Sequence, residues 1–189
     1  AGAWFRHPPR PLRIYRQSRS FGRLALDFDS GRWAAEHKLN GFRGLAYVRE
    51  NGRVEVLSRH ARPLLLTPAD RDRLGRLPPY TLLDGELMGG RKENAGSLAE
   101  NFVAFDVVSI GGRDMTQFVY DKRREALEDL LQPAGLVAVV SYRDGNLAER
   151  YEEAIRTPGV EGLVVKRLDA PWRAGRNEQD EYPPWIKVK

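Results

Sequence analysis

Short blocks of alternating apolar and polar residues run through the chain, and turn-forming residues separate them. Residues 42–50 alternate with a period of about two, Asn51 and Gly52 follow, and residues 53–58 alternate again. The Asn-Gly pair is a strong signal for a tight connection between strands, because both residues tolerate positive φ angles. The pattern therefore predicts a β-hairpin over residues 42–58.

Other blocks predict the remaining elements. Apolar stretches bounded by glycine, proline or polar residues predict strands over residues 80–88, 101–110, 136–142, 162–167 and 185–189. Apolar residues at helical spacing predict helices over residues 68–74, 122–131 and 146–156. Thr67 and Asn146 are the expected N-caps of the first and third helices. Pro133 and Gly135 are expected to stop the second helix.

The connections between these elements indicate the fold class. Most predicted strands are joined by short turns or by a single helix, which favours an α+β domain with mixed, largely antiparallel sheets flanked by helices. Residues 6–23 are rich in arginine and proline, so residues 1–30 are predicted to form a basic N-terminal arm of the same domain. A solvated arm is favoured over an arm that contacts phosphates. Residues 169–184 are expected to form a loop.

Composition narrows the classes of protein. The 189 residues are 41% hydrophobic and 30% charged, which is typical of one soluble globular domain. The chain has no cysteine, which excludes a disulfide scaffold, a thiolate zinc site, an iron–sulfur cluster and a cysteine nucleophile. No apolar run approaches the roughly 18 residues that a membrane-spanning helix needs.

The net charge of +5 favours a polyanionic partner, with nucleic acid first. Only six of the 31 basic residues are lysines. Arginine stays protonated, whereas lysine can serve as a nucleophile, so each lysine is a candidate for a required amine.

Several common catalytic signatures are missing from the sequence. There is no P-loop lysine followed by serine or threonine, no GxGxxG after a strand, no HExxH and no GxSxG. The histidines His7, His37 and His60 have no metal-ligand spacing. A nucleotide enzyme built on this chain must therefore hold phosphates with side chains.

Six short motifs carry chemically useful side chains. They are Lys38-Leu-Asn-Gly-Phe-Arg43, Ser58-Arg59, Asp84-Gly-Glu86, Phe102-Val-Ala-Phe105-Asp106, Glu161-Gly-Leu-Val-Val-Lys166 and Trp185-Ile-Lys187-Val-Lys189. Each alone is typical of an ordinary turn, an apolar strand or a solvated strand end. Lys187 and Lys189 share one face of a strand, whereas Phe102 and Phe105 lie on opposite faces.

In this order, the motifs resemble those of the covalent nucleotidyltransferases, the superfamily of ATP-dependent DNA ligases, RNA ligases and mRNA capping enzymes. The similarity runs from about residue 33 to residue 189. The Lys-x-x-Gly-x-Arg, Leu-Leu-Asp-Gly-Glu and Glu-Gly-Leu-Val-Val-Lys runs look most like the adenylation domain of ATP-dependent DNA ligases. The resemblance implies a DNA ligase/ATP-grasp-like nucleotidyltransferase core over residues 31–189.

By this resemblance, Lys38 attacks the α-phosphate of ATP, forms a lysyl-AMP phosphoramidate and passes AMP to the 5′-phosphate of a nicked polynucleotide. The attack needs a neutral amine, and an ordinary lysine is almost always protonated at pH 7. The resemblance assigns Lys187, Lys189 and Mg²⁺ to the positive field that favours the neutral amine and neutralises the phosphate. Glu161 is the implied carboxylate near the metal.

The resemblance also implies the contacts of the nucleotide. Glu86 accepts hydrogen bonds from the ribose, Phe105 stacks on adenine, and Glu36 and His37 lie where the family recognises the edge of adenine. Arg43 and Arg59 match positions near the ribose and the 5′-phosphate of the nick. No role is assigned to Lys166.

Two departures from the family pattern keep alternatives open. Asn40 stands where the family has aspartate, which favours an RNA ligase or a catalytically impaired nucleotide- or DNA-binding domain as alternatives. The family's C-terminal OB-fold domain is not in this chain, and we expect it as a partner domain. Nicked duplex DNA is the expected substrate, with RNA ends as the alternative. We expect an intracellular monomer, cytoplasmic or associated with the nucleoid, that acts in DNA repair or replication.

Overall fold

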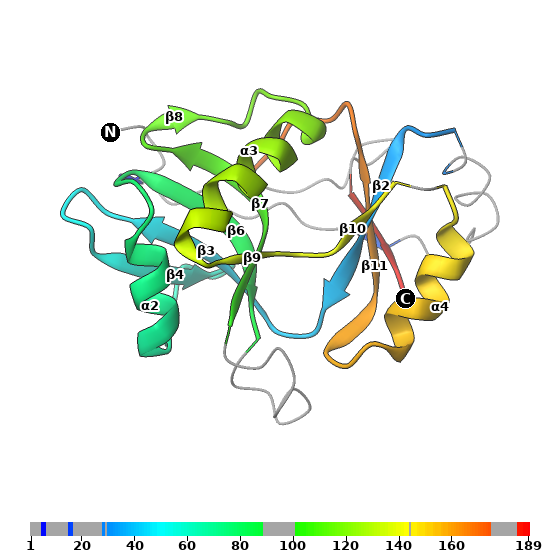
Figure 1. The fold of residues 1–189 in the computed structure, drawn as a ribbon, viewed down its shortest axis with the longest axis horizontal. Helices are drawn as coiled ribbons and strands as arrows, with labels where there is room; N and C mark the ends of the chain where they lie inside the picture. Colours follow the sequence, from blue (N-terminus) through cyan, green and yellow to red (C-terminus); the bar gives the residue numbers. More distant parts are fainter. Residues whose placement is uncertain are drawn as a thin grey trace.

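Two β-sheets stand side by side in the computed structural model, which describes residues 5–6, 15–16, 28, 30–88, 101–143, 145–174 and 185–189 (Figure 1). The larger sheet has the strand order β5-β4-β3-β6-β7-β8, with β9 also paired to β7. Its strands are β3 (Phe42–Val48), β4 (Val54–Ser58), β5 (Pro63–Leu64), β6 (Thr81–Leu87), β7 (Phe102–Ile110), β8 (Arg113–Asp114) and β9 (Val137–Ala138).

The smaller sheet has the strand order β1-β12-β11-β2-β10. Its strands are β1 (Tyr15–Arg16), β2 (Trp33–Leu39), β10 (Ser141–Tyr142), β11 (Val160–Arg167) and β12 (Trp185–Val188). Only the β1–β12 and β7–β9 pairs are parallel among the described strands. The expected mixed, largely antiparallel α+β fold is therefore confirmed.

Within the described residues, three helices cover the outer faces of the sheets (Figure 1): α2 (Pro68–Gly75), α3 (Tyr120–Ala134) and α4 (Leu147–Arg156). Leu74 of α2 and Leu127 of α3 pack on the larger sheet, and Leu147 and Ala154 of α4 pack on the smaller one. A third apolar cluster, which includes Leu45, Tyr47, Leu82, Val108, Val164, Trp172 and Trp185, joins the inner faces of the two sheets. The core is thus layered helix, sheet, sheet, helix.

The predicted hairpin and helix caps are confirmed. Strands β3 and β4 pair in antiparallel register. Of the two turn residues, only Gly52 has a positive φ, at 77°, and its N–H donates to the Arg49 carbonyl. Thr67 and Asn146 each accept a hydrogen bond from the backbone N–H three residues later.

Two predicted boundaries are wrong in part. Helix α3 is not stopped by Pro133, but it ends at Ala134 with Gly135 as its C-cap, at a φ of 70°, as expected. Pro133 has no N–H and so removes one hydrogen bond from the last turn of the helix, and Gly135 two residues later supplies the left-handed cap. The predicted strand over residues 136–142 is two short strands, since β9 pairs with β7 of the larger sheet and β10 pairs with β2 of the smaller sheet.

The predicted N-terminal arm, residues 1–30, lies largely outside the described residues. Within it, the two residues of β1 pair with β12. Residues 175–184 of the predicted loop also lie outside. None of the described helices has the length and apolar character to cross a membrane.

Candidate active site

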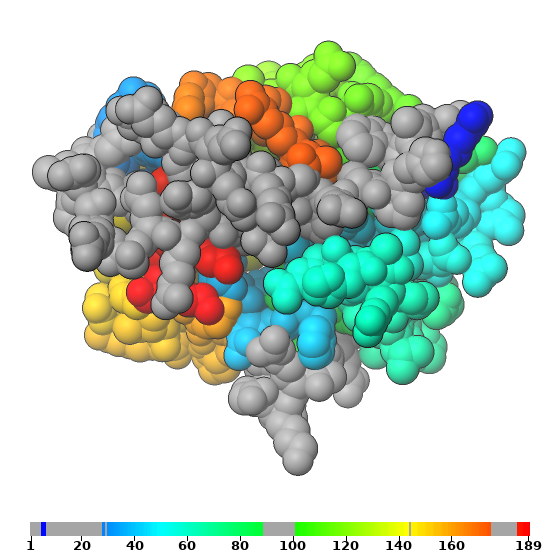
Figure 2. All heavy atoms as spheres, turned by 180° about the vertical axis from the view of Figure 1, so that it is seen from behind, coloured from blue at the N-terminus to red at the C-terminus, as the bar shows by residue number. Residues whose placement is uncertain are grey.

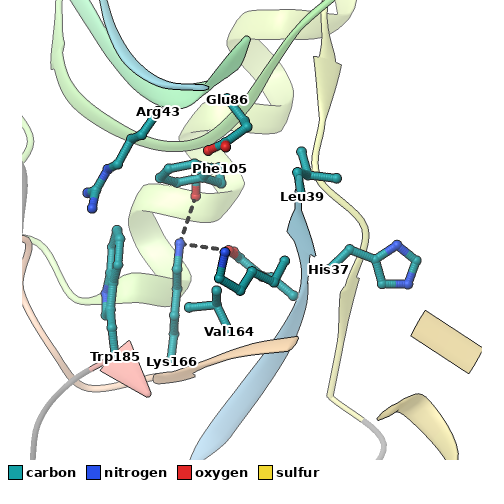
Figure 3. A pocket seen from close by; sticks show the side chains of 10 residues that line it. His37, Leu39, Arg43, Glu86, Phe105, Val164, Lys166 and Trp185 are labelled. Atoms are coloured by element: carbon teal, nitrogen blue, oxygen red, sulfur yellow. Dashed lines mark hydrogen bonds and ion pairs between the residues drawn. The ribbon is translucent and has the colours of Figure 1, made fainter. Parts of the chain in front are cut away.

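Strand β2 presents its polar side chains on two opposite faces. Glu36 and Lys38, two residues apart, line a pocket at the junction of the two sheets. His37 borders the pocket, but its ring points away from the other labelled side chains (Figure 3). Its Nε2 lies 3.3 Å from the Tyr142 hydroxyl. The alternation of a strand therefore gives the pocket the side chains of Glu36 and Lys38 and not the imidazole.

A β-bulge turns Glu161 towards Lys38. The register of β11 on β2 shifts between Val160 and Leu163, so Glu161 and Gly162 together oppose Lys38. A bulge of this kind re-aims a side chain. Gly162 has a φ of 138°, which glycine adopts without strain. The bulge thus puts the Glu161 carboxylate on the same face of the sheet as the Lys38 ammonium.

Glu161 bridges two lysines. One carboxylate oxygen accepts a hydrogen bond from Lys38 Nζ, and the other accepts one from Lys189 Nζ at 2.9 Å. Burial alone would raise the pKa of Glu161, but the two lysines hold it below its ordinary value. Burial, and then the charges of Lys38 and Lys189, lower the pKa of Lys187. Lys38 and Lys189 therefore contact one carboxylate and the Lys187 charge lies close by, which leaves excess positive charge for an anion.

The larger sheet contributes Arg43 and Glu86, which are direct cross-strand neighbours on β3 and β6. Asp84 holds the Arg43 guanidinium with two hydrogen bonds, from Nε at 3.0 Å and from Nη2 at 2.6 Å. The indole N–H of Trp172 also donates to Asp84, at 3.1 Å. The bidentate pair fixes the plane of the guanidinium.

Glu86 is a carboxylate in a partly buried position. It accepts the backbone N–H of Gly41 at 3.0 Å. Burial raises the pKa of Glu86 to about 7, against the lowering influence of the Lys38 charge and the Gly41 N–H. A Cβ at position 41 would lie 2.5 Å from the Leu87 carbonyl oxygen, so this close approach requires glycine.

Phe105 and Trp185 form an aromatic wall. Their ring centroids are 6.0 Å apart and the rings are nearly perpendicular. Arg43 lies beside both rings, with its guanidinium carbon 5.5 Å from the Phe105 centroid and 5.4 Å from the Trp185 centroid (Figure 3). Phe102 faces the opposite side of β7 and is buried under the helices, as expected from the sequence. Aromatic faces of this kind suit a planar base.

Lys166 is fully buried at the back of the pocket. Its Nζ lies 2.7 Å from Glu36 Oε2, donates to the Phe105 carbonyl at 3.1 Å, and stands 3.9 Å from the Trp185 ring centroid (Figure 3). A buried ammonium needs such partners, because desolvation of a lone charge is costly. Lys166 therefore ties the smaller sheet to β7.

Most predicted site residues come together. The pocket has about 350 Å³ of space, including its open side, and is lined by Glu36, His37, Lys38, Leu39, Arg43, Glu86, Phe105, Val164, Lys166 and Trp185. Glu161, Lys187 and Lys189 adjoin it through Lys38. Seen from behind, the red residues of β12 reach the surface beside the orange segment of β11 and the blue segment of β2 (Figure 2).

Two predicted residues lie apart from this group. Arg59 is exposed in the turn after β4, where its Nε donates to His60. Asn40 lies in the turn between β2 and β3, and its N–H donates to the Gly159 carbonyl at 2.9 Å.

The donor set limits which metal the site fits. Among the described residues, no three His, Cys, Asp or Glu side chains gather into a metal site. Glu161 offers one carboxylate beside the ammonium groups of Lys38 and Lys189. This suits Mg²⁺, which keeps several waters and takes further oxygens from phosphates, and does not suit a metal held by protein alone.

Sequence reasoning missed four residues around the pocket. Asp84 and Trp185 were inside the motifs but had no role, and Trp172 and Tyr120 were not singled out. Tyr120 donates a hydrogen bond to Glu36 at 2.5 Å from α3. No local signal in the sequence reveals this contact between residues 84 positions apart.

Sequence comparisons with known proteins match this chain to DNA ligases, in agreement with a pocket suited to a nucleotide. The family model described as "ATP dependent DNA ligase domain" matches residues 90–189. A probable DNA ligase from Dictyoglomus thermophilum is 28% identical, over 95% of this chain and 35% of the relative. The multifunctional non-homologous end joining protein LigD from Mycolicibacterium smegmatis is also 28% identical, over 86% of this chain and 22% of the relative.

A solved structure has the same fold. The mycobacterial DNA ligase D complexed with ATP and MES superposes with a TM-score of 0.72 and 25% identity, over 96% of this chain and 60% of that chain. The chain spans about a third or less of the length of the curated relatives named above.

Proposed function

We propose, since this chain belongs to the ATP-dependent DNA ligase family, that it is an adenylation domain that carries AMP on Lys38. The single observation that carries the proposal is the contact of Lys38 and Lys189 with Glu161, with the Lys187 charge close by, beside an aromatic pocket. The lysines suit the phosphates of a nucleotide, and the aromatic wall suits its base.

In the proposed binding mode, Phe105 stacks on adenine and Glu36 accepts a hydrogen bond from its edge. His37 contributes main chain rather than its ring. Glu86 faces the ribose hydroxyls, and its raised pKa lets it accept or donate a hydrogen bond near neutral pH. Arg43, held by Asp84, lies near the ribose.

In the proposed first step, the neutral Lys38 amine attacks the α-phosphorus of ATP. A nitrogen–phosphorus bond forms while the bond to the bridging oxygen breaks, pyrophosphate leaves with that electron pair, and Nζ loses a proton to solvent. The Lys38–Glu161 pair must open first, because the ammonium has no lone pair for attack. Lys187 and Lys189 neutralise the phosphates as Lys38 turns towards them.

Two further displacements complete the proposed reaction. An oxygen of the 5′-phosphate at a nick attacks the same phosphorus, the nitrogen–phosphorus bond breaks, and the Lys38 nitrogen takes up a proton from solvent as it leaves. A 3′-hydroxyl then attacks the 5′-phosphorus and loses its proton to solvent, the bond from that phosphorus to the bridging oxygen breaks, and AMP leaves with that electron pair, which seals the strand. Arg59, exposed after β4, is proposed to contact the 5′-phosphate.

Glu161 is proposed to hold Mg²⁺ once the lysines turn to phosphate. When bound, this cation supplies charge neutralisation at the phosphates. Glu161 thus has two successive partners, first the lysines and then the cation.

The complete protein is proposed to add a C-terminal OB-fold domain and to act on nicked duplex DNA in repair or replication. The greater length of the relatives supports further domains. Asn40, in place of the family aspartate, keeps RNA ends as the alternative substrate.

The first step is tested by incubating the complete protein with Mg²⁺ and ATP labelled at the α-phosphate. We expect one labelled AMP per chain. Lys38→Ala is expected to lower labelling at least a thousandfold, because no other amine among the described residues occupies the position of Lys38 in the pocket. Lys122→Ala, which removes an exposed lysine on α3, is the matched control and is expected to label normally.

The substrate is tested by discharging the labelled protein onto nicked DNA or nicked RNA. Transfer to DNA supports the proposal, and faster transfer to RNA moves the assignment to RNA ligases. Undiminished labelling of Lys38→Ala would refute the proposed nucleophile.

A further inference from the structure

One face of α3 reaches into the back of the nucleotide pocket. Tyr120 and Arg124 are four residues apart and so lie on the same face of the helix. Both are buried, and both point at Glu36 of β2: the Tyr120 hydroxyl lies 2.5 Å from Oε1, and Arg124 Nη1 lies 3.6 Å from the same oxygen. The helix that covers the larger sheet therefore reaches a side chain of the smaller sheet.

The Glu36 carboxylate is fixed from both ends. Tyr120 holds Oε1, and Lys166 Nζ lies 2.7 Å from Oε2. An ionised carboxylate has about four acceptor sites, so these two contacts leave further lone pairs available. Because Glu36 also lines the pocket, the remaining acceptor sites are within reach of a bound ligand.

Tyr120 acts only as a donor to Glu36. Burial, followed by the neighbouring charge of Glu36, raises the pKa of Tyr120 well above its ordinary value. The hydroxyl therefore keeps its proton at physiological pH. Since Tyr120, Arg124 and Lys166 all present N–H or O–H groups, Glu36 remains an acceptor.

A fixed acceptor discriminates between bases. The exocyclic amine of adenine can donate to Glu36, whereas a 6-oxo purine would set an oxygen against an oxygen. A site built to accept an N–H rejects an analogue that lacks it, because the buried acceptor is left unpaired.

We propose that Tyr120 is a positioning residue that, together with Lys166, holds Glu36 as the acceptor for the 6-amino group of the nucleotide base. The inference rests on the proposed function, because it concerns the nucleotide of that same pocket. Tyr120 does not touch the nucleotide and acts through Glu36.

The test compares ATP with purine riboside triphosphate, which has hydrogen in place of the 6-amino group. The rate of AMP or purine-nucleotide transfer onto the complete protein is measured as kcat/KM for each. The unsubstituted protein is expected to prefer ATP by at least tenfold, and inosine triphosphate, with a 6-oxo group, is expected to react more slowly still.

Tyr120→Phe removes only the hydroxyl. The preference for ATP is expected to fall about five- to tenfold, with the loss confined to ATP and the analogue reacting at an unchanged rate. A merely structural role would slow both nucleotides equally and leave the ratio unchanged, which would overturn the inference. Tyr47→Phe is the matched control, because Tyr47 is also fully buried and its hydroxyl has no hydrogen-bond partner among the described residues.

The outcomes separate the inference from the function. If the Tyr120→Phe variant does not fold, the ratio of kcat/KM for ATP to kcat/KM for the analogue in the unsubstituted protein still tests the inference. Equal values for the two nucleotides would show that Glu36 does not bind the 6-amino group. Such equality would leave the proposed function intact. Absence of any adduct with ATP would refute the function itself, and the inference with it.

Discussion

Buried charge is concentrated around the pocket, and each such side chain has a partner. Asp106 pairs with Arg123 through hydrogen bonds of 2.7 and 3.0 Å, and Glu36 pairs with Lys166. Paired charges keep their orientation when a ligand enters, so they act as fixed dipoles. Glu86 differs, because burial outweighs the charges around it.

Glu86 makes stability depend on pH. Its pKa is about 7 in the folded chain against an ordinary value of 4.5, so the folded state binds more protons between these values. Stability contributed by Glu86 is therefore present below about pH 4.5 and is lost as the pH rises through 7. Glu86→Gln, which does not titrate, is expected to gain roughly 2–3 kcal/mol relative to the unsubstituted chain between pH 4.5 and pH 8.

Urea unfolding of both chains at the two pH values measures this gain. Only the change in their difference matters, because a constant offset from the lost hydrogen bond cancels. The same difference at both pH values would contradict the raised pKa.

At the scale of single residues, the sequence indicated which residues belong to the site better than it indicated which side chains they contact. Lys38 was assigned its role through the resemblance of its motif to the ligases, because a lysine beside a turn is ordinary by itself. Lys166 had no role, because its partners Glu36 and Phe105 are distant in sequence and meet it only through strand pairing. The resemblance placed both Glu36 and His37 at the edge of adenine, and the alternation of β2 turns the His37 ring away from the other pocket side chains (Figure 3).

The hydrophobic pattern predicts most of the strands and helices closely, but it does not predict the bulges and register shifts within the strands. The periodicity of residues 162–167 predicts a strand, but a period of two alone places Glu161 on the face opposite Val164 and Lys166. The bulge at Gly162 reverses this. In β7, the register shifts opposite Asp84 and Gly85, and Phe105 has no cross-strand partner there. Phe105 and the next residue, Asp106, therefore both lie on the inner face of the sheet. Register shifts depend on both strands of a pair, so one strand's pattern cannot reveal them.

The bulge gives a prediction at the scale of the element. A Cβ at position 162 would lie 2.2 Å from the Val188 carbonyl oxygen, and φ is 138°. Gly162→Ala is therefore expected to lower the free energy of unfolding by about 2–4 kcal/mol, by strain and by separation of β11 from β12.

Gly52→Ala is the matched control. Gly52 also has a positive φ, at 77°, but nothing lies within 4 Å of an added Cβ. We expect a loss of about 1 kcal/mol, from backbone strain alone. Equal losses for the two variants, measured by urea unfolding, would show that the contact with Val188 does not matter.

At the scale of the whole molecule, the site depends on two sheets that meet along one apolar seam. Lys38, Glu161 and Lys187 come from the smaller sheet, with Lys189 directly after its strand β12, and Arg43, Glu86 and Phe105 come from the larger one. Val164 and Trp185 pack against Leu45 and Leu82 across the seam. The order of motifs predicted this convergence only through the resemblance to ligases, because hydrophobic periodicity does not say which sheets face each other.

The central claim is that Lys38 becomes covalently bound to AMP. The most direct measurement is peptide mapping by mass spectrometry after the complete protein reacts with ATP and Mg²⁺. We predict that the peptide carrying Lys38, and no other peptide, gains the mass of one AMP through an acid-labile bond, as expected of a phosphoramidate. AMP found on another residue, or an unmodified Lys38 peptide from protein that seals nicks with ATP, would contradict the account.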